Sequence, residues 1–288
     1  MPNELTGILN VNKPPGWTSH DVVAKVRRLA NQKRVGHAGT LDPMAEGVLP
    51  ILLGRATRLA DFIHTGRKIY RAVVKLGAAT DTDDADGEIT LTSDVPPLSE
   101  PLLRERLEAF QGDITQMPPI YSALKVDGRR AYAVARSGGA VELQPRHISI
   151  HELRLLSYDT DELSLEVTCS TGTYVRALAR DIGASLGTVG HLTALTRTQL
   201  GPFSLADAVS LERLAADGVA PHLVSAALAV PGAPSYTADA GQVGQLVNGQ
   251  PVEAAGLRAD SVWVYDPDGL LVCLASADGA HVRPRLQL

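Results

Sequence analysis

Hydrophobic residues recur along this chain with two different periods, and their order limits the folds that it can adopt. Segments 19–30, 101–110 and 175–186 carry the three-to-four-residue spacing of a helix with one buried face. Segments 69–76 and 163–169 instead alternate at every second residue, as strands with one buried face do. These helices and strands do not follow a regular β-α-β order. The pattern therefore predicts an α+β fold with a mixed or antiparallel central sheet flanked by helices.

Polar and glycine residues indicate where these elements begin and end. Residues 7–12 are a short apolar strand followed by the turn-rich NKPPGWTS. Ser19 and Ser99 are each placed to cap the N-terminus of a helix, and Gly187 is placed to end the helix over 175–186.

The chain becomes rich in proline and glycine at VPGAPS, residues 230–235, which predicts a boundary there. Beyond it, SVWVY and LLVCLA flank Asp266-Pro267-Asp268-Gly269, a hairpin signal, and Val243, Leu246 and Val247 suggest a short helix. We therefore expect two domains, with residues 1–230 forming the larger one and residues 235–288 a small β domain.

The charges are distributed unevenly along the chain. The net charge is −5, which argues against a nucleic-acid partner, yet residues 1–75 carry a balance of +7 and the rest carries −12. This asymmetry favours a localised phosphate-binding surface, although chance unevenness is the alternative. Two widely separated cysteines fit neither a disulfide framework nor a zinc site, and no segment resembles a signal peptide or a membrane span. We expect a cytoplasmic protein without a membrane partner.

Residues 35–50 read VGHAGTLDPMAEGVLP, a loop with one prominent carboxylate. Asp42 precedes a proline, so its backbone is biased towards an extended conformation and its side chain can be presented from a rigid turn. Spacing alone allows a purely structural turn.

The loop and its neighbours resemble the TruB family of tRNA pseudouridine-55 synthases. GHAGTLDPMAEGVLPI is similar to the catalytic loop of that family, and further matches follow in the order of the family over residues 8–203, about two thirds of the chain. They are NKPPGWTS, KIYRAVVKLG with TDTDDADG, MPPIYSALKVDGRRAYAVAR, CSTGTYVRALARDIG and GHLTALTRTQLGPF. The resemblance implies a pseudouridine synthase catalytic domain with an RNA-gripping insertion at about 117–147. More loosely, it implies that the C-terminal domain is PUA-like.

The resemblance implies three catalytic residues: Asp42, Tyr70 and Arg176. Asp42 is the essential carboxylate, which can stabilise charge at ribose C1′ or bond to the sugar or the base; the sequence leaves open which. Arg176 would pair with Asp42 and favour its ionised form. Tyr70 would stack on the target base and can take the sugar proton. Taken without the resemblance, a surface arginine and a core tyrosine are the simpler interpretations.

The resemblance also implies a set of RNA-contacting residues. His37 would contact the RNA near the flipped nucleotide, Tyr174 and Leu195 would line the base pocket, Lys13 would support the site, and Asp84 would accept hydrogen bonds from bases. Packing, or a solvated lysine, is the alternative for each of these except Asp84. Candidates for the RNA backbone are Arg27, Arg28, Lys33, Arg34, Lys125, Arg129 and Arg130, with Lys25 and Arg136 nearby.

Neither a metal nor an organic cofactor is expected. If Gly87 were the sixth position of an EF-hand loop, the twelfth would be Ser93 rather than a bidentate glutamate. Isomerisation of uridine needs no redox carrier. We expect the T arm of tRNA as the partner, a monomer, and no obligatory protein partner. Alternatives are a guide-RNA-dependent synthase of the dyskerin type, a tRNA-folding protein and a base-releasing glycosidase.

Overall fold

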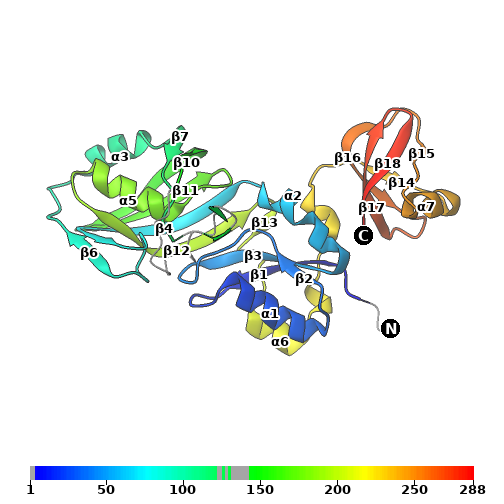
Figure 1. Cartoon of the computed structure of the whole chain (residues 1–288), viewed down its shortest axis with the longest axis horizontal. Coiled ribbons are helices and arrows are strands. Elements are labelled where there is room, and N and C mark those ends of the chain that lie inside the picture. The colour runs from blue at the N-terminus through cyan, green and yellow to red at the C-terminus, as the bar shows by residue number, and fades with distance from the viewer. Residues whose placement is uncertain (1–3, 122–124, 127–128, 131–142) are drawn as a thin grey trace.

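The computed structural model describes residues 4–121, 125–126, 129–130 and 143–288. A large mixed sheet fills the N-terminal body, and a smaller sheet lies apart from it at the C-terminal end (Figure 1). The predicted α+β class is confirmed.

The large sheet has the strand order β1-β3-β12-β4-β11-β10-β7, with β2 added to β3 and β13 to β12. All its pairings are antiparallel except that of β3 with β12, which is parallel. Its strands are β1 (Gly7–Lys13), β2 (Val35–His37), β3 (Glu46–Leu53), β4 (Lys68–Leu76), β7 (Gly112–Gln116), β10 (Arg146–Asp159), β11 (Glu162–Cys169), β12 (Gly190–Leu200) and β13 (Phe203–Ser204).

The parallel pairing of β3 and β12 joins the two halves of this sheet. It consists of only two residue pairs, Thr196 with Glu46 and Arg197 with Gly47. At Gly47 φ is +101°, and a Cβ there would lie 2.3 Å from the carbonyl oxygen of Arg197. Only glycine allows the strands to approach this closely.

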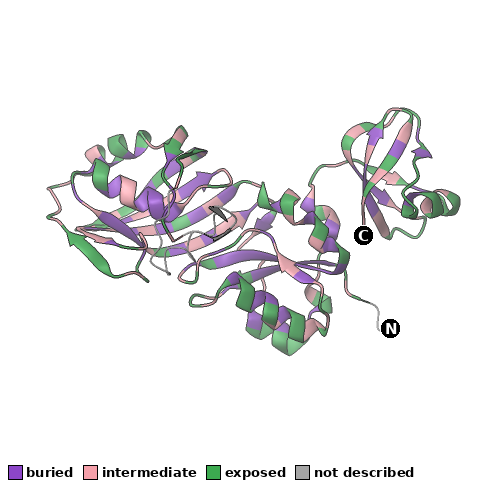
Figure 2. Cartoon of the chain, in the orientation of Figure 1, coloured by how far each residue is buried: buried purple, intermediate pink, exposed green. Residues whose placement is uncertain are grey.

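Helices cover the large sheet and leave their outer faces exposed (Figure 2). Helix α1 lies against α6, and α3 and α5 cover the other end of the sheet (Figure 1). The helical elements of the body are α1 (Ser19–Ala30), η1 (Gly54–Leu59), α2 (Ala60–His64), α3 (Glu100–Glu108), α5 (Val175–Ser185), α6 (Leu211–Asp217), η2 (Ala220–His222) and η3 (Ala226–Ala229). Two small hairpins are β5 (Ala78–Thr80) with β6 (Ile89–Thr92), and β8 (Lys125–Val126) with β9 (Arg129–Arg130).

The cap of α1 corrects one prediction. Thr18, rather than Ser19, is the N-cap, and it forms a capping box with Asp21. Ser19 is the first helical residue, and its hydroxyl is buried against the backbone of Leu41. Both residues have cap-forming hydroxyls, and the acidic residue three positions after Thr18 decides between them. Ser99 caps α3 and the helix over 175–185 ends before Gly187, both as predicted.

The small sheet has the order β14-β16-β17-β18-β15 and carries α7. Its elements are β14 (Ser235–Thr237), α7 (Ala240–Val247), β15 (Val252–Glu253), β16 (Arg258–Tyr265), β17 (Leu271–Asp278) and β18 (His281–Gln287). The predicted hairpin around Asp266–Gly269 connects β16 to β17.

A shared apolar cluster connects the small sheet to the body. Trp263 packs in one cluster with Ile8, Leu52 and Ala229, and its indole nitrogen donates to the carbonyl oxygen of Val230 at 3.2 Å. The division into domains at 1–230 and 235–288 stays a prediction, since a chain segment that packs in this way need not fold independently.

Candidate active site

Asp42 lies in the loop between β2 and β3, and the first turn of α1 holds this loop in place. The Ser19 hydroxyl accepts from the Leu41 amide at 2.9 Å and donates to the Leu41 carbonyl at 3.1 Å. Leu41 itself is 3% exposed. The residue before Asp42 is therefore fixed in both its backbone and its side chain.

Lys13 also holds the loop that carries Asp42, which fits the supporting role that the resemblance implies for it. Its side chain is fully buried, and its ammonium donates to the carbonyls of Pro14 at 3.0 Å, Trp17 at 2.5 Å and Pro43 at 3.2 Å. Burial lowers the pKa of this ammonium to about 8, although the charges of Asp42 and Glu46 raise it. A lysine so enclosed supports the loop from within the protein.

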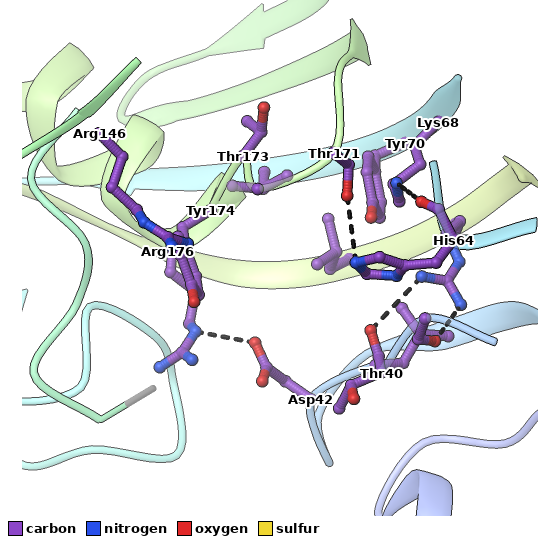
Figure 3. Close-up of a pocket in the computed structure, with 16 residues that line it drawn as sticks. Thr40, Asp42, His64, Lys68, Tyr70, Arg146, Thr171, Thr173, Tyr174 and Arg176 are labelled. Atoms are coloured by element: carbon purple, nitrogen blue, oxygen red, sulfur yellow. Dashed lines mark hydrogen bonds and ion pairs between the residues drawn. The ribbon is translucent and has the colours of Figure 1, made fainter. Parts of the chain in front are cut away.

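Arg176 enters the site from the start of α5. Its guanidinium is 6% exposed, and Nε lies 2.9 Å from Oδ2 of Asp42, whose side chain is 35% exposed (Figure 3). The ion pair expected between the two side chains is present. Arg176 also donates to the carbonyls of Thr82 at 2.9 Å and Tyr121 at 3.0 Å.

Asp84 is the second carboxylate beside Arg176, and its contact with bases stays a prediction. Its side chain is 6% exposed, and Oδ2 lies 3.3 Å from Nη1 of Arg176. Oδ1 accepts from the Thr82 hydroxyl at 2.6 Å and from the Asp86 amide at 3.1 Å. The carboxylate is enclosed by protein partners and orients the guanidinium.

Tyr70 forms the back wall of the site from β4. Its neighbours at every second position, Ala72, Val74 and Leu76, share its buried face as predicted. Burial raises the pKa of the Tyr70 hydroxyl above its ordinary value of 10.0, and the charge of Arg197 and a hydrogen bond from it act in the opposite direction. The hydroxyl therefore stays protonated at neutral pH.

Arg197 is a fully buried residue of the site to which the sequence alone assigns no catalytic part. From β12 its guanidinium donates to the carbonyls of Gly39 at 2.9 Å, Thr40 at 3.4 Å and Val48 at 2.8 Å. Those carbonyls lie on both sides of Asp42 in the chain. No salt bridge to Arg197 occurs within the described part of the chain, so its charge is neutralised mainly by backbone dipoles.

These side chains surround a cavity of about 290 Å³, close to the lower limit for small-ligand pockets. Asp42, Tyr70 and Arg176 all line it (Figure 3), as do Tyr174 and Leu195. The other lining residues are Gly39, Thr40, Leu41, His64, Lys68, Arg146, Thr171, Gly172, Thr173, Val175 and Arg197. The structure thus brings the three proposed catalytic residues together.

Lys68 and His64 also line the cavity and were not singled out in the sequence. Lys68 stands two residues before Tyr70, so the alternation of β4 places both on one face. Its ammonium donates to the carbonyls of His64 at 2.7 Å and Gly66 at 3.2 Å. Burial, and then the charge of Arg197, lowers its pKa to about 8. The period-two pattern was the available signal for Lys68.

The other predicted RNA contacts lie outside the cavity. His37 ends β2 and does not line it, and on α1 Arg28 is exposed. Nη2 of Arg27 donates to the Val35 carbonyl at 2.8 Å, and Nε of Arg34 donates to the Thr57 hydroxyl at 3.0 Å. Lys33 is exposed. Lys125, Arg129 and Arg130 lie on the β8–β9 hairpin, and Arg136 lies outside the described residues.

Within the described ranges, no group of three or more histidine, cysteine, aspartate or glutamate side chains could hold a metal ion. Cys169 and Cys273 are both buried free thiols. No helix of the described chain is long and apolar enough to cross a membrane.

Two family models match this chain in succession. The model described as the TruB family pseudouridylate synthase N-terminal domain matches residues 27–175, and that of the tRNA pseudouridylate synthase B C-terminal domain matches residues 176–222. Together they span more than half of the chain.

Several curated relatives are named tRNA pseudouridine synthase B. The Thermobifida fusca protein is 43% identical over 286 residues, covering 96% of this chain and 97% of the relative. The Arthrobacter protein is 41% identical, covering 98% of this chain and 96% of the relative. The Heliobacterium modesticaldum protein is 51% identical, covering 74% of this chain and 71% of the relative.

Two solved structures show the same fold. A crystal structure of a Cbf5-Nop10-Gar1 complex and an H/ACA RNP bound to a substrate RNA containing 2′-deoxyuridine each match with a TM-score of 0.72. In both cases the identity is 26%, covering 98% of this chain and 84% of the other.

Proposed function

This chain belongs to the TruB family of pseudouridylate synthases, and from that premise we propose that it isomerises the T-loop uridine at position 55 of tRNA to pseudouridine. The observation that carries the proposal is the Asp42–Arg176 ion pair at the edge of a cavity walled by Tyr70. The tRNA substrate is supported by relatives 41–43% identical over nearly the whole chain, compared with 26% identity to the H/ACA RNP protein.

Asp42 is the group that acts on the nucleoside. The bond from ribose C1′ to N1 of uracil breaks, the base turns, and C5 bonds to C1′; C5 loses a proton and N1 gains one, so no atom enters or leaves overall. A carboxylate can stabilise the positive charge that develops at C1′, or bond covalently to the substrate. Asp42 is suited to either role because it is partly exposed to the cavity while Ser19 holds the backbone of the preceding Leu41.

Arg176 positions Asp42 and places a positive charge beside its carboxylate. The guanidinium is itself oriented by Asp84 and by two backbone carbonyls, so it presents Nε to Asp42 in a fixed direction. Arginine suits this bridging role because its donors lie in one rigid plane.

Tyr70 supplies an aromatic wall for the uracil ring. Because burial raises the pKa of its hydroxyl, the tyrosinate form is rare at neutral pH. If Tyr70 takes the substrate proton, it must give up its own proton in the same step. If Tyr70 only stacks on the base, Tyr70→Phe would leave the rate unchanged, because phenylalanine keeps the aromatic ring.

The target nucleotide must leave the RNA stack before it can enter this cavity. Flipping costs on the order of a few kcal/mol, which contacts to the surrounding RNA have to offset. Lys68, Arg146 and Arg197 give the cavity a cationic lining in a protein of net charge −5. We propose that the β8–β9 hairpin and α1 add backbone contacts, and that the PUA-like small domain contacts the tRNA farther from the target.

We propose further that the enzyme acts in the cytoplasm, as a monomer, without a cofactor or an obligatory protein partner. A guide-dependent enzyme of the dyskerin type would need a guide RNA and additional proteins. A tRNA-folding protein would bind without modifying, and a glycosidase would release free uracil.

The test is to incubate the purified chain alone with an unmodified tRNA transcript and map pseudouridine at single-nucleotide resolution. We expect modification at position 55 only, no free uracil, and no activity from Asp42→Asn, with tRNA affinity of that variant within several-fold of wild type. Wild-type turnover by Asp42→Asn would refute the assignment of Asp42. Dependence on added guide RNA would refute the tRNA assignment.

A further inference from the structure

A second cavity, of about 510 Å³, adjoins the first. Four residues line both cavities: His64, Arg146, Thr171 and Gly172. The second is completed by Pro145, His147 and Ile148. Among these described lining residues none is a carboxylate, and the polar ones offer two imidazoles, a guanidinium and a hydroxyl. This chemistry suits an anion.

His64 stands at the junction of the two cavities. It ends α2 and is exposed, and its Nε2 lies 3.2 Å from the Thr171 hydroxyl (Figure 3). On the other side, a Cβ added to Gly39 would lie 3.6 Å from Nδ1 of His64. The imidazole therefore bridges the loop that carries Asp42 and the loop that leads into α5.

The charged groups around His64 are mostly cationic. Lys68 on β4 binds the His64 carbonyl, and Arg197 on β12 and Arg146 on β10 line the first cavity with it. His147, the residue after Arg146 on β10, is the other titratable group that lines the second cavity with His64. Asp61 lies on its own helix, and Asp42 is the carboxylate on the facing loop. Partial burial, followed by the charges of Lys68 and Arg197, lowers the pKa of His64 below 6.5, while Asp61 acts against them. His64 is therefore neutral at pH 7 when no anion is bound.

We propose that His64 binds one of the two phosphodiester groups flanking the target uridine, with the adjacent nucleotide in the second cavity, and takes up a proton from solvent on binding. The inference rests on the proposed function, since it assumes that the target occupies the first cavity. A neighbouring phosphate favours the charged imidazole. A protonated ring donates from both nitrogens, so it can keep its hydrogen bond with the Thr171 hydroxyl and still donate to a phosphate oxygen.

The sign of the pH effect follows from this proton uptake. Because the bound state holds one more proton, the RNA affinity rises as the pH falls through the pKa of the complex. The measurement is the dissociation constant of a T-arm hairpin between pH 5.5 and 8.5, in an Asp42→Asn background that prevents turnover. His64→Gln should weaken binding about tenfold at pH 6, as expected for a lost charge-assisted hydrogen bond, and less than twofold at pH 8.

His151→Gln is the matched control, since His151 is an exposed histidine on β10 that lines neither cavity. We expect it to leave binding unchanged at every pH. The proposal would be overturned if the dissociation constants of the Asp42→Asn enzyme with and without His64→Gln kept a constant ratio across the pH range.

Hairpins with a single uncharged methylphosphonate, placed either 5′ or 3′ of the target, identify the phosphate. At one position the neutral linkage should abolish the pH-dependent gain in affinity, and His64→Gln should add no further loss. The contact would be refuted if, at both positions, the neutral linkage and His64→Gln lowered the affinity independently, so that their effects multiplied. This experiment needs no substitution at His64, because the pH dependence of binding to the neutral-linkage hairpin alone reports the proton uptake.

Pseudouridine formation by the unmutated enzyme on the normal hairpin is measured in parallel. Its absence would count against the proposed function. Its presence without any coupling between His64 and a phosphate would count against this inference alone.

Discussion

Replacing Arg176 by lysine should remove most of the activity and a large part of the stability of the protein. Arg176 contacts Asp42 at 2.9 Å, Asp84 at 3.3 Å, and the carbonyls of Thr82 and Tyr121 at 2.9 and 3.0 Å. Lysine keeps the charge but concentrates its donors at one point, so it cannot reach all four partners.

The magnitude of the stability loss follows from the burial of Asp84. Its side chain is 6% exposed, and removing one partner of a buried ion pair costs about 3–5 kcal/mol. Because lysine retains part of the attraction, we expect about 3 kcal/mol, the lower end of that range. If Asp42 loses its fixed orientation, a displacement of about 1 Å lowers the rate on the order of 100-fold.

Single-turnover rates at saturating tRNA and urea unfolding measure the two effects separately. Arg180→Lys is the control, because Arg180 lies one turn later on α5 and pairs with Asp83 and Asp181, yet is 31% exposed and does not line the cavity. Arg180→Lys should lose less stability than Arg176→Lys, and its single-turnover rate should fall by no more than about threefold. An Arg176→Lys enzyme within threefold of the wild-type rate would refute the reasoning.

Three other changes test separate parts of the structure. Gly47→Ala should destabilise the fold by more than about 2 kcal/mol in urea unfolding, because its Cβ would lie 2.3 Å from the Arg197 carbonyl oxygen. Gly249→Ala is the control: it is also at positive φ but has open space around it, so it should cost about 1 kcal/mol. Burial lowers the pKa of Lys68 from 10.5 to about 8, so the unfolded state binds more protons between these values. Through Lys68, stability should therefore rise with pH in that window by up to about 1.4 kcal/mol per unit. Lys13, whose pKa is lowered to about 8 as well, adds a contribution of the same sign, so Lys68→Met should reduce the slope without abolishing it. Tyr70→Phe should retain tRNA binding and, if the hydroxyl carries a proton, lose on the order of 100-fold or more in single-turnover rate; an unchanged rate would restrict Tyr70 to stacking.

Much of the fold could be predicted from periodicity, because packing against one core imposes a local repeat. The strand containing Tyr70 and the helix containing Arg176 are both where the spacing places them. The cap of α1 was shifted by one residue because Thr18 and Ser19 offer the same hydroxyl chemistry. Sequence spacing alone does not predict which of the two hydroxyls binds the backbone of Leu41, which is distant in the sequence.

The candidate site was predictable where a motif named the residue and unpredictable where burial decided its role. Lys13 and Asp84 are polar residues in recognisable motifs, but their enclosure depends on Pro43 and Arg176, which lie 30 and 92 positions away in the sequence. Arg197 shows the same limitation, because a lone arginine in a strand gives no local sign that it binds the carbonyls of a distant loop.

The position of Arg197 explains why the site forms at the junction of the two halves of the sheet. The β3–β12 pairing has only two residue pairs, so backbone hydrogen bonds alone hold this junction weakly. The guanidinium adds bonds to Gly39, Thr40 and Val48, and thereby ties the loop with Asp42 to the strand beside Tyr70. Because Arg176 approaches the same aspartate from α5, on the other half of the sheet, the reactive carboxylate is held from both halves at once. Any change that separates β3 from β12 should therefore reduce catalysis before it unfolds either half.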